Sequence, residues 1–264
     1  MNNETIEKLL RYGKEIEAKT EYYGKKLRGK KSLVREEVRK AEATGILPRV
    51  IGRERLKVGD VWVNLFHALT AFDRREGYTI FQDYSYLLDY RKRMYCVSVM
   101  DHTSTSGTLI DREVLEVSQI VNVVRFSKHY MERFEERNKA QVLKVGILEE
   151  AVIMDLLSDS SMYPGALMTG RFIDPEIFRQ VNSEETIKEF QEILKDLANG
   201  DERILKYLSE DAGVVKTNLG YGIYSKRGNV ITMITWLKTD MLSQTQKDIF
   251  WILTQGLVSD ESLL

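Results

Sequence analysis

Three short apolar runs follow one another near the C-terminal end of this chain, at Val214–Asn218, Gly220–Ser225 and Val230–Lys238. Only short turns separate them, and Arg227–Asn229 supplies the glycine and asparagine that tight hairpin turns favour. Strands that are joined by such short turns must run antiparallel. These residues therefore predict an antiparallel meander, and the last run should be a central strand because it is apolar on both faces.

Two segments earlier in the chain carry similar strand signals. Met94–Met100 is a compact apolar run, and Val114–Phe126 alternates between two apolar faces. We therefore predict an α+β fold whose antiparallel sheet forms from residues 92–126 and 213–238. A helix that begins after Phe126, and a last helix capped by Asp240, should cover this sheet.

The pattern of residues 3–43 predicts two helices, the second with Ser32 as its N-cap. This pair has few apolar residues, so we expect an appendage or an assembly element rather than a part of the core. The expected organisation is a helical N-terminal element over residues 1–45 and an α+β domain over 46–264. A helical insertion is expected at about residues 158–212.

Two longer apolar segments predict buried helices. Val61–Phe72 is apolar all round and predicts a short buried helix. His67 lies inside this run, where a packed core histidine is more common than a ligand. Ala140–Leu157 is nearly continuous in valine, leucine and isoleucine, so it predicts a central helix that is buried on most sides.

The composition is typical of a soluble globular protein, with 43% apolar and 30% charged residues among 264. The sequence has no run of about eighteen apolar residues, so we expect no membrane span. The charged N-terminal segment resembles neither a secretory signal nor a transit peptide. The single cysteine, Cys96, excludes an internal disulfide and any cysteine-based zinc site, which fits a reducing cytoplasm.

The net charge of −1 excludes a protein that binds polyanions with its whole surface. One short segment is nevertheless strongly basic. Such a cluster is usually a solvated helix face, but it can also bind a nucleic acid or a protein partner. The basic residues are Lys25, Lys26, Arg28, Lys30, Lys31, Arg35 and Arg39.

The helix predicted after Phe126 offers candidate catalytic residues. His129, Arg133 and Arg137 are spaced four residues apart, so they lie on one stripe of that helix. Two guanidinium groups can hold a phosphate, and an imidazole can transfer a proton near neutral pH. In the alternative interpretation, Glu132 and Glu136 neutralise the arginines and the histidine packs as an ordinary side chain.

The C-terminal meander offers possible partners for this stripe. Tyr224 lies near the turn that contains Lys226 and Arg227, and Thr235 is a polar residue in an otherwise apolar strand. A buried hydroxyl group needs a hydrogen-bond partner. Threonine also favours strands by propensity alone, however, so a structural role for Thr235 is the simpler alternative.

Common cofactor and metal motifs are absent from the sequence. It contains no histidine pair or paired-carboxylate spacing typical of a metal site, no glycine-rich phosphate loop and no nucleophile elbow. We therefore expect no metal and no cofactor, and nucleotide-dependent chemistry is disfavoured. The loop at residues 101–107 is rich in hydroxyl groups and contains His102, so it could bind a phosphate or a metal, but Asp101 and Asp111 are ordinary loop and turn residues.

The Ser-Lys-His-x-x-x-Arg-x-x-x-Arg segment from Ser127 to Arg137, followed by an antiparallel meander, resembles the barnase–colicin–RelE-like ribonuclease toxins. The likeness covers about 12 residues of the helix and about 25 residues of 220–244. The resemblance implies metal-independent attack of a ribose 2′-hydroxyl group on its own phosphate. His129 would then be the general acid or base, Arg133 would stabilise the transition state, and Tyr224 or Thr235 would contact the phosphate. This chain is several times longer and is not basic overall.

Two functions are therefore expected. The first is phosphodiester cleavage of RNA or another nucleic acid without a metal. The second is a non-catalytic interaction, inhibitory or structural role, in which residues 1–45 dock a partner through their basic helices. No membrane partner is expected in either case, and the expected location is the cytoplasm.

Overall fold

The computed structural model describes residues 4–73, 75, 78–101, 119–157, 192, 195–196 and 212–255. The chain divides into two compact units, one formed by residues 1–124 with 160–169 and one by residues 125–159 with 170–264. Both units contain helices and antiparallel strands, which confirms the predicted α+β class.

The first unit begins with two helices and continues with strands. Neighbouring strands from β1 to β4 pair antiparallel, and β5 lies next to β4. The strands β1 to β3 extend the sheet beyond the residues 92–126 that the sequence predicted. Its described elements are α1 (Glu4–Arg28), α2 (Lys31–Thr44), β1 (Arg49–Val58), β2 (Val61–Asp73), β3 (Tyr78–Leu88), β4 (Met94–Asp101) and β5 (Gln119–Phe126), which ends in the second unit.

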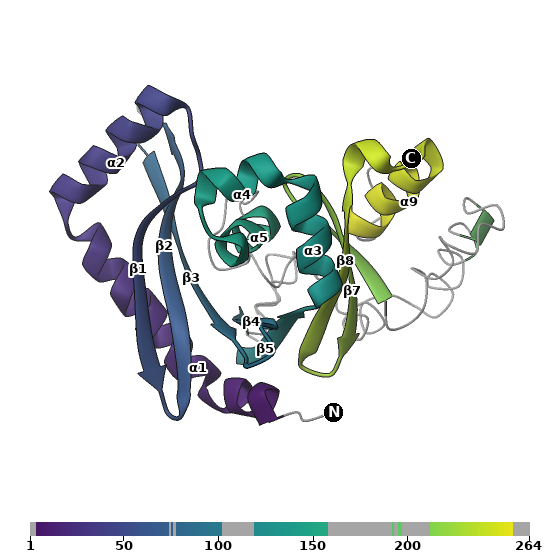
Figure 1. Ribbon diagram of the computed structural model, residues 1–264, viewed down its shortest axis with the longest axis horizontal. Helices are drawn as coiled ribbons and strands as arrows, with labels where there is room; N and C mark the ends of the chain where they lie inside the picture. Colours follow the sequence, from purple (N-terminus) through teal and green to yellow (C-terminus); the bar gives the residue numbers. More distant parts are fainter. Residues whose placement is uncertain are drawn as a thin grey trace, which may run out of the picture. The chain divides into compact units, whose positions relative to one another are not determined.

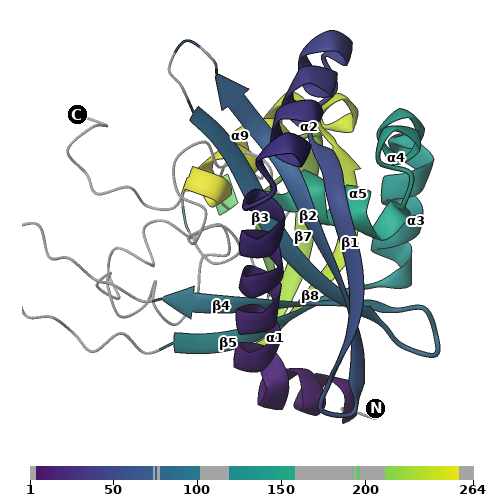
Figure 2. The same cartoon turned by 90° about the vertical axis from the view of Figure 1, so that its left-hand side faces the viewer.

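Helix α1 belongs to the core of this unit, so the expectation of an appendage was wrong. It packs against strands β1 to β4, as Figures 1 and 2 show, and it buries Leu9, Ile16 and Leu27. Small residues, including Thr20 and Gly24, occupy the same buried stripe. Because small residues let the helix approach the sheet closely, a few large apolar residues are enough to seal the interface.

The segment from Val61 to Asp73 is strand β2, and the prediction of a helix there was wrong. Strand β2 lies between β1 and β3, and its residues 65–69 are all buried. A strand that is covered on both faces is a continuous apolar run, so its periodicity resembles that of a buried helix. The β-branched and aromatic residues of the run favour the strand.

Helix α2 begins at Lys31, one residue before the predicted N-cap Ser32. The Val34 N–H group donates to the Lys30 carbonyl, so the first helical turn already includes Ser32. Lys30 is the residue at the cap, and its side chain makes no capping hydrogen bond. The helix ends at Gly45, as its left-handed φ of 63° requires.

The second unit contains the predicted meander of β6 (Ala212–Lys216), β7 (Gly220–Arg227) and β8 (Val230–Lys238), whose neighbouring strands pair antiparallel. Gly228, with φ of 54°, closes the turn between β7 and β8. The helices among the described residues of this unit are α3 (Lys128–Arg137), α4 (Lys139–Val145), α5 (Leu148–Leu157) and α9 (Gln244–Gln255), and a short 3-10 helix, η2, covers Thr239–Met241.

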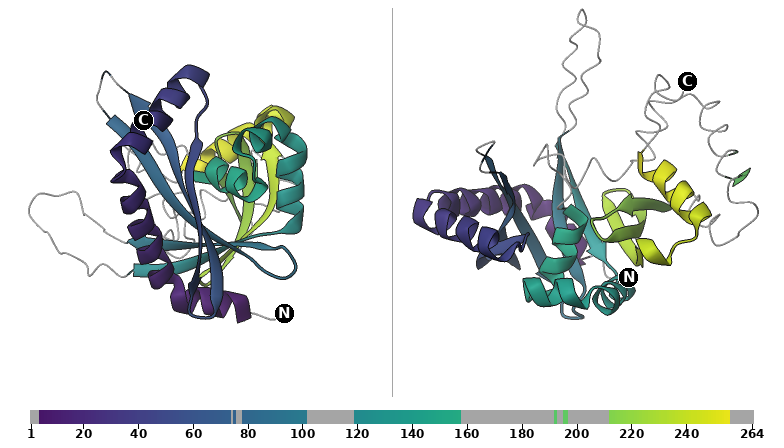
Figure 3. Two further views of the ribbon diagram at one scale, coloured as in Figure 1. Left: turned by 60° about the vertical axis from the view of Figure 1, so that its left-hand side comes forward. Right: turned by 90° about the horizontal axis from the view of Figure 1, so that it is seen from above.

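Helices α3 and α9 both cover the meander, as predicted, and the structure places them on opposite faces of it. On one face, Phe134 of α3 packs edge-on against Trp236 of β8. On the other, Phe250 of α9 packs against Tyr221 of β7. Figure 1 shows the two helices on either side of β7 and β8, and Figure 3 shows the yellow α9 beside the light-green strands.

Two helix boundaries in this unit differ from the prediction. The expected helix over 140–157 is two helices, because the chain turns at Gly146 with φ of 85°. The last helix is capped by Ser243 and Gln246 rather than by Asp240. The side-chain oxygen of each of these two residues accepts a hydrogen bond from the backbone N–H group of the other. The predicted insertion at 158–212 and the loop at 102–107 lie almost wholly outside the described residues.

The close approach of α1 to the sheet gives a stability prediction. A Cβ atom at Gly24 would lie 2.0–2.2 Å from the Asp83 carboxylate, whereas one at Gly29 would meet nothing closer than 3.5 Å. Helix propensity alone would make Gly24→Ala stabilising by about 1 kcal/mol. We expect it instead to lower the free energy of unfolding by about 1–3 kcal/mol, since the carboxylate must move.

Urea unfolding of the full chain measures this difference, and Gly29→Ala is the control, with an expected change below about 0.5 kcal/mol. A Gly24→Ala protein that is as stable as the wild type would show that α1 does not approach β3 this closely.

Candidate functional site

Helix α3 carries the residues that the sequence singled out, and strand β8 fixes where the helix begins. The Ser127 hydroxyl group accepts a hydrogen bond from the Tyr130 N–H group and donates one to the Ile234 carbonyl. Tyr130 and Phe134 form the buried stripe of the helix. The stripe of His129, Arg133 and Arg137 lies beside it.

His129 and Arg133 both reach solvent. His129 is exposed, and the Arg133 side chain is 41% exposed. The Arg133 guanidinium group donates to the Glu136 carboxylate at 2.8 Å, one helical turn further on. A phosphate that binds Arg133 must therefore compete with an acid of the same helix.

Arg137 has a different environment from Arg133. Its guanidinium group donates to the backbone carbonyl of Trp236 in β8 at 2.6 Å. The partners are 99 residues apart in the sequence, and this bond ties the end of α3 to the meander. One N–H group of Arg137 therefore serves a structural hydrogen bond and is not available to a phosphate.

The structure places Tyr224 and Thr235 on opposite faces of the meander. Thr235 pairs with Ile223, and Tyr224 pairs with Met233, so Ile234 is an extra residue in β8. Adjacent residues of β7 point to opposite faces, and paired residues share a face. The two hydroxyl groups therefore cannot contact one phosphate together.

Two candidate site residues on β7, Tyr224 and Lys226, are largely or partly buried. Tyr224 is only 3% exposed, its ring lies over Gly213, and burial raises the pKa of its hydroxyl group. Burial also lowers the pKa of Lys226, which is half-buried. Arg227 is exposed at the end of the strand.

A buried carboxylate that the sequence analysis did not single out organises the meander. Asp155 of α5 accepts from the Trp236 indole N–H group at 3.1 Å and from the Leu219 N–H group at 2.8 Å. The Asn218 N–H group donates to its backbone carbonyl. An aspartate within the apolar second half of α5 was the available signal, because acids are rarely buried without partners.

Tyr130 lies close to this carboxylate. Burial, and then the negative charge of Asp155, raise the pKa of the Tyr130 hydroxyl group. That hydroxyl group finds no hydrogen-bond partner among the described residues. Its position under α3 makes it part of the core of the unit rather than of a surface site.

The first unit contains a buried histidine that bonds to a carboxylate. His67 is 1% exposed, and its Nδ1 atom bonds to the Asp83 carboxylate on the neighbouring strand β3. The Arg28 guanidinium group donates to the same carboxylate at 2.7 Å. Packing of His67 in the core was predicted, but its link to Arg28 was not.

Acidic partners divide the basic segment into two groups. Arg28 pairs with Asp83, and Lys25 pairs with Glu21 on the preceding turn of α1. The other five cations are exposed and form no ion pair with the described residues. We call these five, Lys26, Lys30, Lys31, Arg35 and Arg39, the basic strip.

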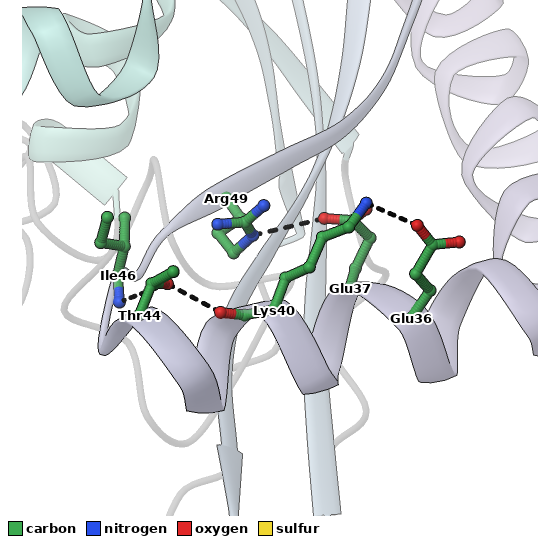
Figure 4. Close-up of polar contacts among 6 residues, drawn as sticks. All are labelled: Glu36, Glu37, Lys40, Thr44, Ile46 and Arg49. Atoms are coloured by element: carbon green, nitrogen blue, oxygen red, sulfur yellow. Dashed lines mark hydrogen bonds and ion pairs between the residues drawn. The ribbon is translucent and has the colours of Figure 1, made fainter.

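Two acids of α2, Glu36 and Glu37, bind cations that do not belong to the basic strip. Glu37 is 8% exposed and accepts from Lys40 at 2.8 Å and from Arg49 at the start of β1 at 3.3 Å, as Figure 4 shows. Lys40 also pairs with Glu36. These contacts attach α2 to β1 and leave the basic strip on a separate side of the helix.

Within the described residues, no three histidine, cysteine, aspartate or glutamate side chains gather as metal ligands would. Helices of the described residues are also too short or too polar to cross a membrane. Cys96 is buried, and burial raises the pKa of its thiol group, so it is not an activated nucleophile.

The two arginines of α3 provide a matched pair for testing these contacts. Arg137→Ala should lower the free energy of unfolding by about 1.5–3 kcal/mol, because it removes a charged donor from a partly buried carbonyl. Arg133→Ala should lower it by less than about 1 kcal/mol, because its ion pair with Glu136 is exposed. Urea unfolding measures both, and equal effects would contradict the assigned contacts.

A comparison with protein-family models, curated proteins and solved structures found no match to this chain. The resemblance to ribonuclease toxins therefore stays a prediction that depends on the α3 residues and the meander. Any functional inference must come from the contacts, burial and charges of the chain itself.

Proposed function

We propose that this protein binds nucleic acid without cleaving it, and that the basic strip on α1 and α2 is the contact surface. The observation that carries the proposal is that five exposed cations, close together in the sequence, have no acidic partner among the described residues. Arg28 and Lys25 of the same segment, by contrast, are each paired with an acid. An uncompensated row attracts a polyanion and gains free energy by releasing its counterions.

The helix geometry supports a continuous contact along α2. At about 100° per residue, Arg35 and Arg39 each lie about 160° from Glu37, and Lys31 lies about 120° from it. Since Glu37 faces β1, these three cations point away from the sheet. They repeat every four residues, which is about one helical turn, and so form a stripe that can follow a phosphate backbone.

The charge of the surrounding sequence also favours a polyanion. Residues 1–100 contain 21 lysine and arginine residues against 14 aspartate and glutamate residues, although the whole chain has a net charge of −1. Tyr22, which is 71% exposed, lies one turn before Lys26 on α1. An exposed aromatic ring beside cations favours nucleic acid over an acidic protein, because nucleobases stack on such rings.

The charge contacts can be tested by salt dependence. Lys31→Ala combined with Arg35→Ala should weaken the binding of a single-stranded oligonucleotide and lower the slope of log affinity against log salt by about 0.7 for each lost phosphate contact. Fluorescence anisotropy at several salt concentrations measures both quantities. The full-length protein should be used for each variant.

The matched control is Lys139→Ala combined with Lys144→Ala, which removes two exposed cations from α4. This pair should leave both the affinity and the salt slope unchanged. Equal loss in the two double variants would mean that net charge, and not the basic strip, determines binding.

Metal-independent cleavage of RNA remains the second candidate function, and the exposure of His129 is the observation that favours it. Incubation of the purified protein with RNA and a chelator distinguishes the two candidates. The binding proposal expects intact RNA, and it expects His129→Ala to bind as the wild type does. Cleavage that disappears in His129→Ala but persists in the control Lys128→Ala would establish the enzyme instead.

A further inference from the structure

The turn between β3 and β4 presents an aromatic ring and cations to solvent. It consists of Asp89, Tyr90, Arg91, Lys92 and Arg93, and it extends beyond the strands of its unit, as Figure 2 shows. Tyr90 is 80% exposed, the largest fraction among the exposed aromatic residues of the described chain. Arg91 and Lys92 are also exposed.

One buried carboxylate holds this turn in shape. Asp89 accepts from the N–H groups of Arg91 and Arg93 at 2.8 and 2.9 Å, and its second oxygen accepts from the Arg93 guanidinium group at 2.7 Å. Burial alone would raise the pKa of Asp89, but these donors bring it below its ordinary value. The carboxylate is therefore ionised near neutral pH, and the turn is fixed before any partner binds.

The backbone of the turn is also fixed at Lys92. Among the described residues, Lys92 is the one non-glycine residue with a left-handed φ, at 57°. Its N–H group donates to the Asp89 carbonyl at 2.9 Å. A lysine held in a conformation that glycine adopts more easily suggests that its side chain, rather than its backbone, is needed at this position.

The exposed side chains are arranged as a ring with a cation beside it. The guanidinium carbon of Arg91 lies 5.1 Å from the centre of the Tyr90 ring, within cation–π range. Of the three cations in the turn, Arg93 forms an ion pair with Asp89, so the charges of Arg91 and Lys92 are available to a ligand.

We propose that this turn binds an unpaired base of a single-stranded nucleic acid, which stacks on Tyr90 while Arg91 and Lys92 contact the neighbouring phosphates. The inference rests on the proposed nucleic-acid binding, and it adds the class of nucleic acid and a second contact. Stacking on an exposed ring requires a base that is free of its own duplex. An acidic protein would use the same cations but would gain little from the ring.

The experiment compares three fluorescent ligands with the full-length protein by anisotropy. They are a single strand of about 12 nucleotides, an abasic strand of the same length and charge, and a duplex of the same sequence. Tyr90→Ala should weaken binding to the single strand by between about 5-fold and 150-fold, the range for losing one stacked base. It should leave binding to the abasic strand, and the salt slope, unchanged.

Two further variants separate the ring from the charge. Tyr90→Phe keeps the ring and should bind the single strand as the wild type does. Lys92→Gly suits the left-handed backbone and removes only the cation, so it should lower the salt slope by about 0.7. Both substitutions are at exposed positions, and thermal melts confirm that the variants fold.

The outcomes distinguish this inference from the proposal on which it rests. If the wild type binds the strands but Tyr90→Ala binds them equally well, the proposal of base stacking on Tyr90 is wrong, and the proposal that the basic strip binds nucleic acid is unaffected. Tighter binding to the duplex or to the abasic strand than to the single strand would also contradict base stacking on the β3–β4 turn, and it would leave the proposal for the basic strip unaffected. If no ligand binds to the wild type, both proposals fail.

Discussion

The Asp83 carboxylate is the contact on which the first unit depends most. It bonds to His67 on the adjacent strand and to Arg28 on α1, and the absence of a side chain at Gly24 makes room for it. A carboxylate that leaves water loses hydration, which only well-placed donors can offset. Helix α1 cannot shift by one turn along the sheet without separating Arg28 from this carboxylate. The start of α2, and with it the basic strip, is positioned as a result.

The charged residues of the chain fall into two groups with different roles. Some arginines donate to buried or partly buried acceptors; these are Arg28, Arg49, Arg93 and Arg137. The bonds of Arg28 and Arg137 join elements that are distant in the sequence. The cations of the basic strip, and Arg91 and Lys92 of the β3–β4 turn, have no such acceptors in the described part of the chain. Counting charges in the sequence cannot separate these groups, because the separation depends on which acids the fold brings near.

The sequence predicted those parts of the fold that local patterns determine. The meander and its glycine turn depend on residues close together in the chain, so alternation and turn chemistry were sufficient. The strand β2 was mistaken for a helix because burial on both faces removes the alternation that identifies a strand. The contacts of Arg28 and Arg137 join residues 55 and 99 positions apart, which no local pattern can predict. The residues of the β3–β4 turn were overlooked because their importance depends on exposure.

The extra residue in β8 has a consequence for how this part of the chain can evolve. Because Ile234 has no counterpart in β7, Met233 and Trp236 point to the same face although three positions separate them. Trp236 can then reach both Phe134 and the Asp155 carboxylate. Loss of the Ile234 codon would restore simple alternation and leave the indole on this face, because Met233 and Trp236 would then be two positions apart. Selection thus acts on the face to which Trp236 points more strictly than on the number of residues in β8.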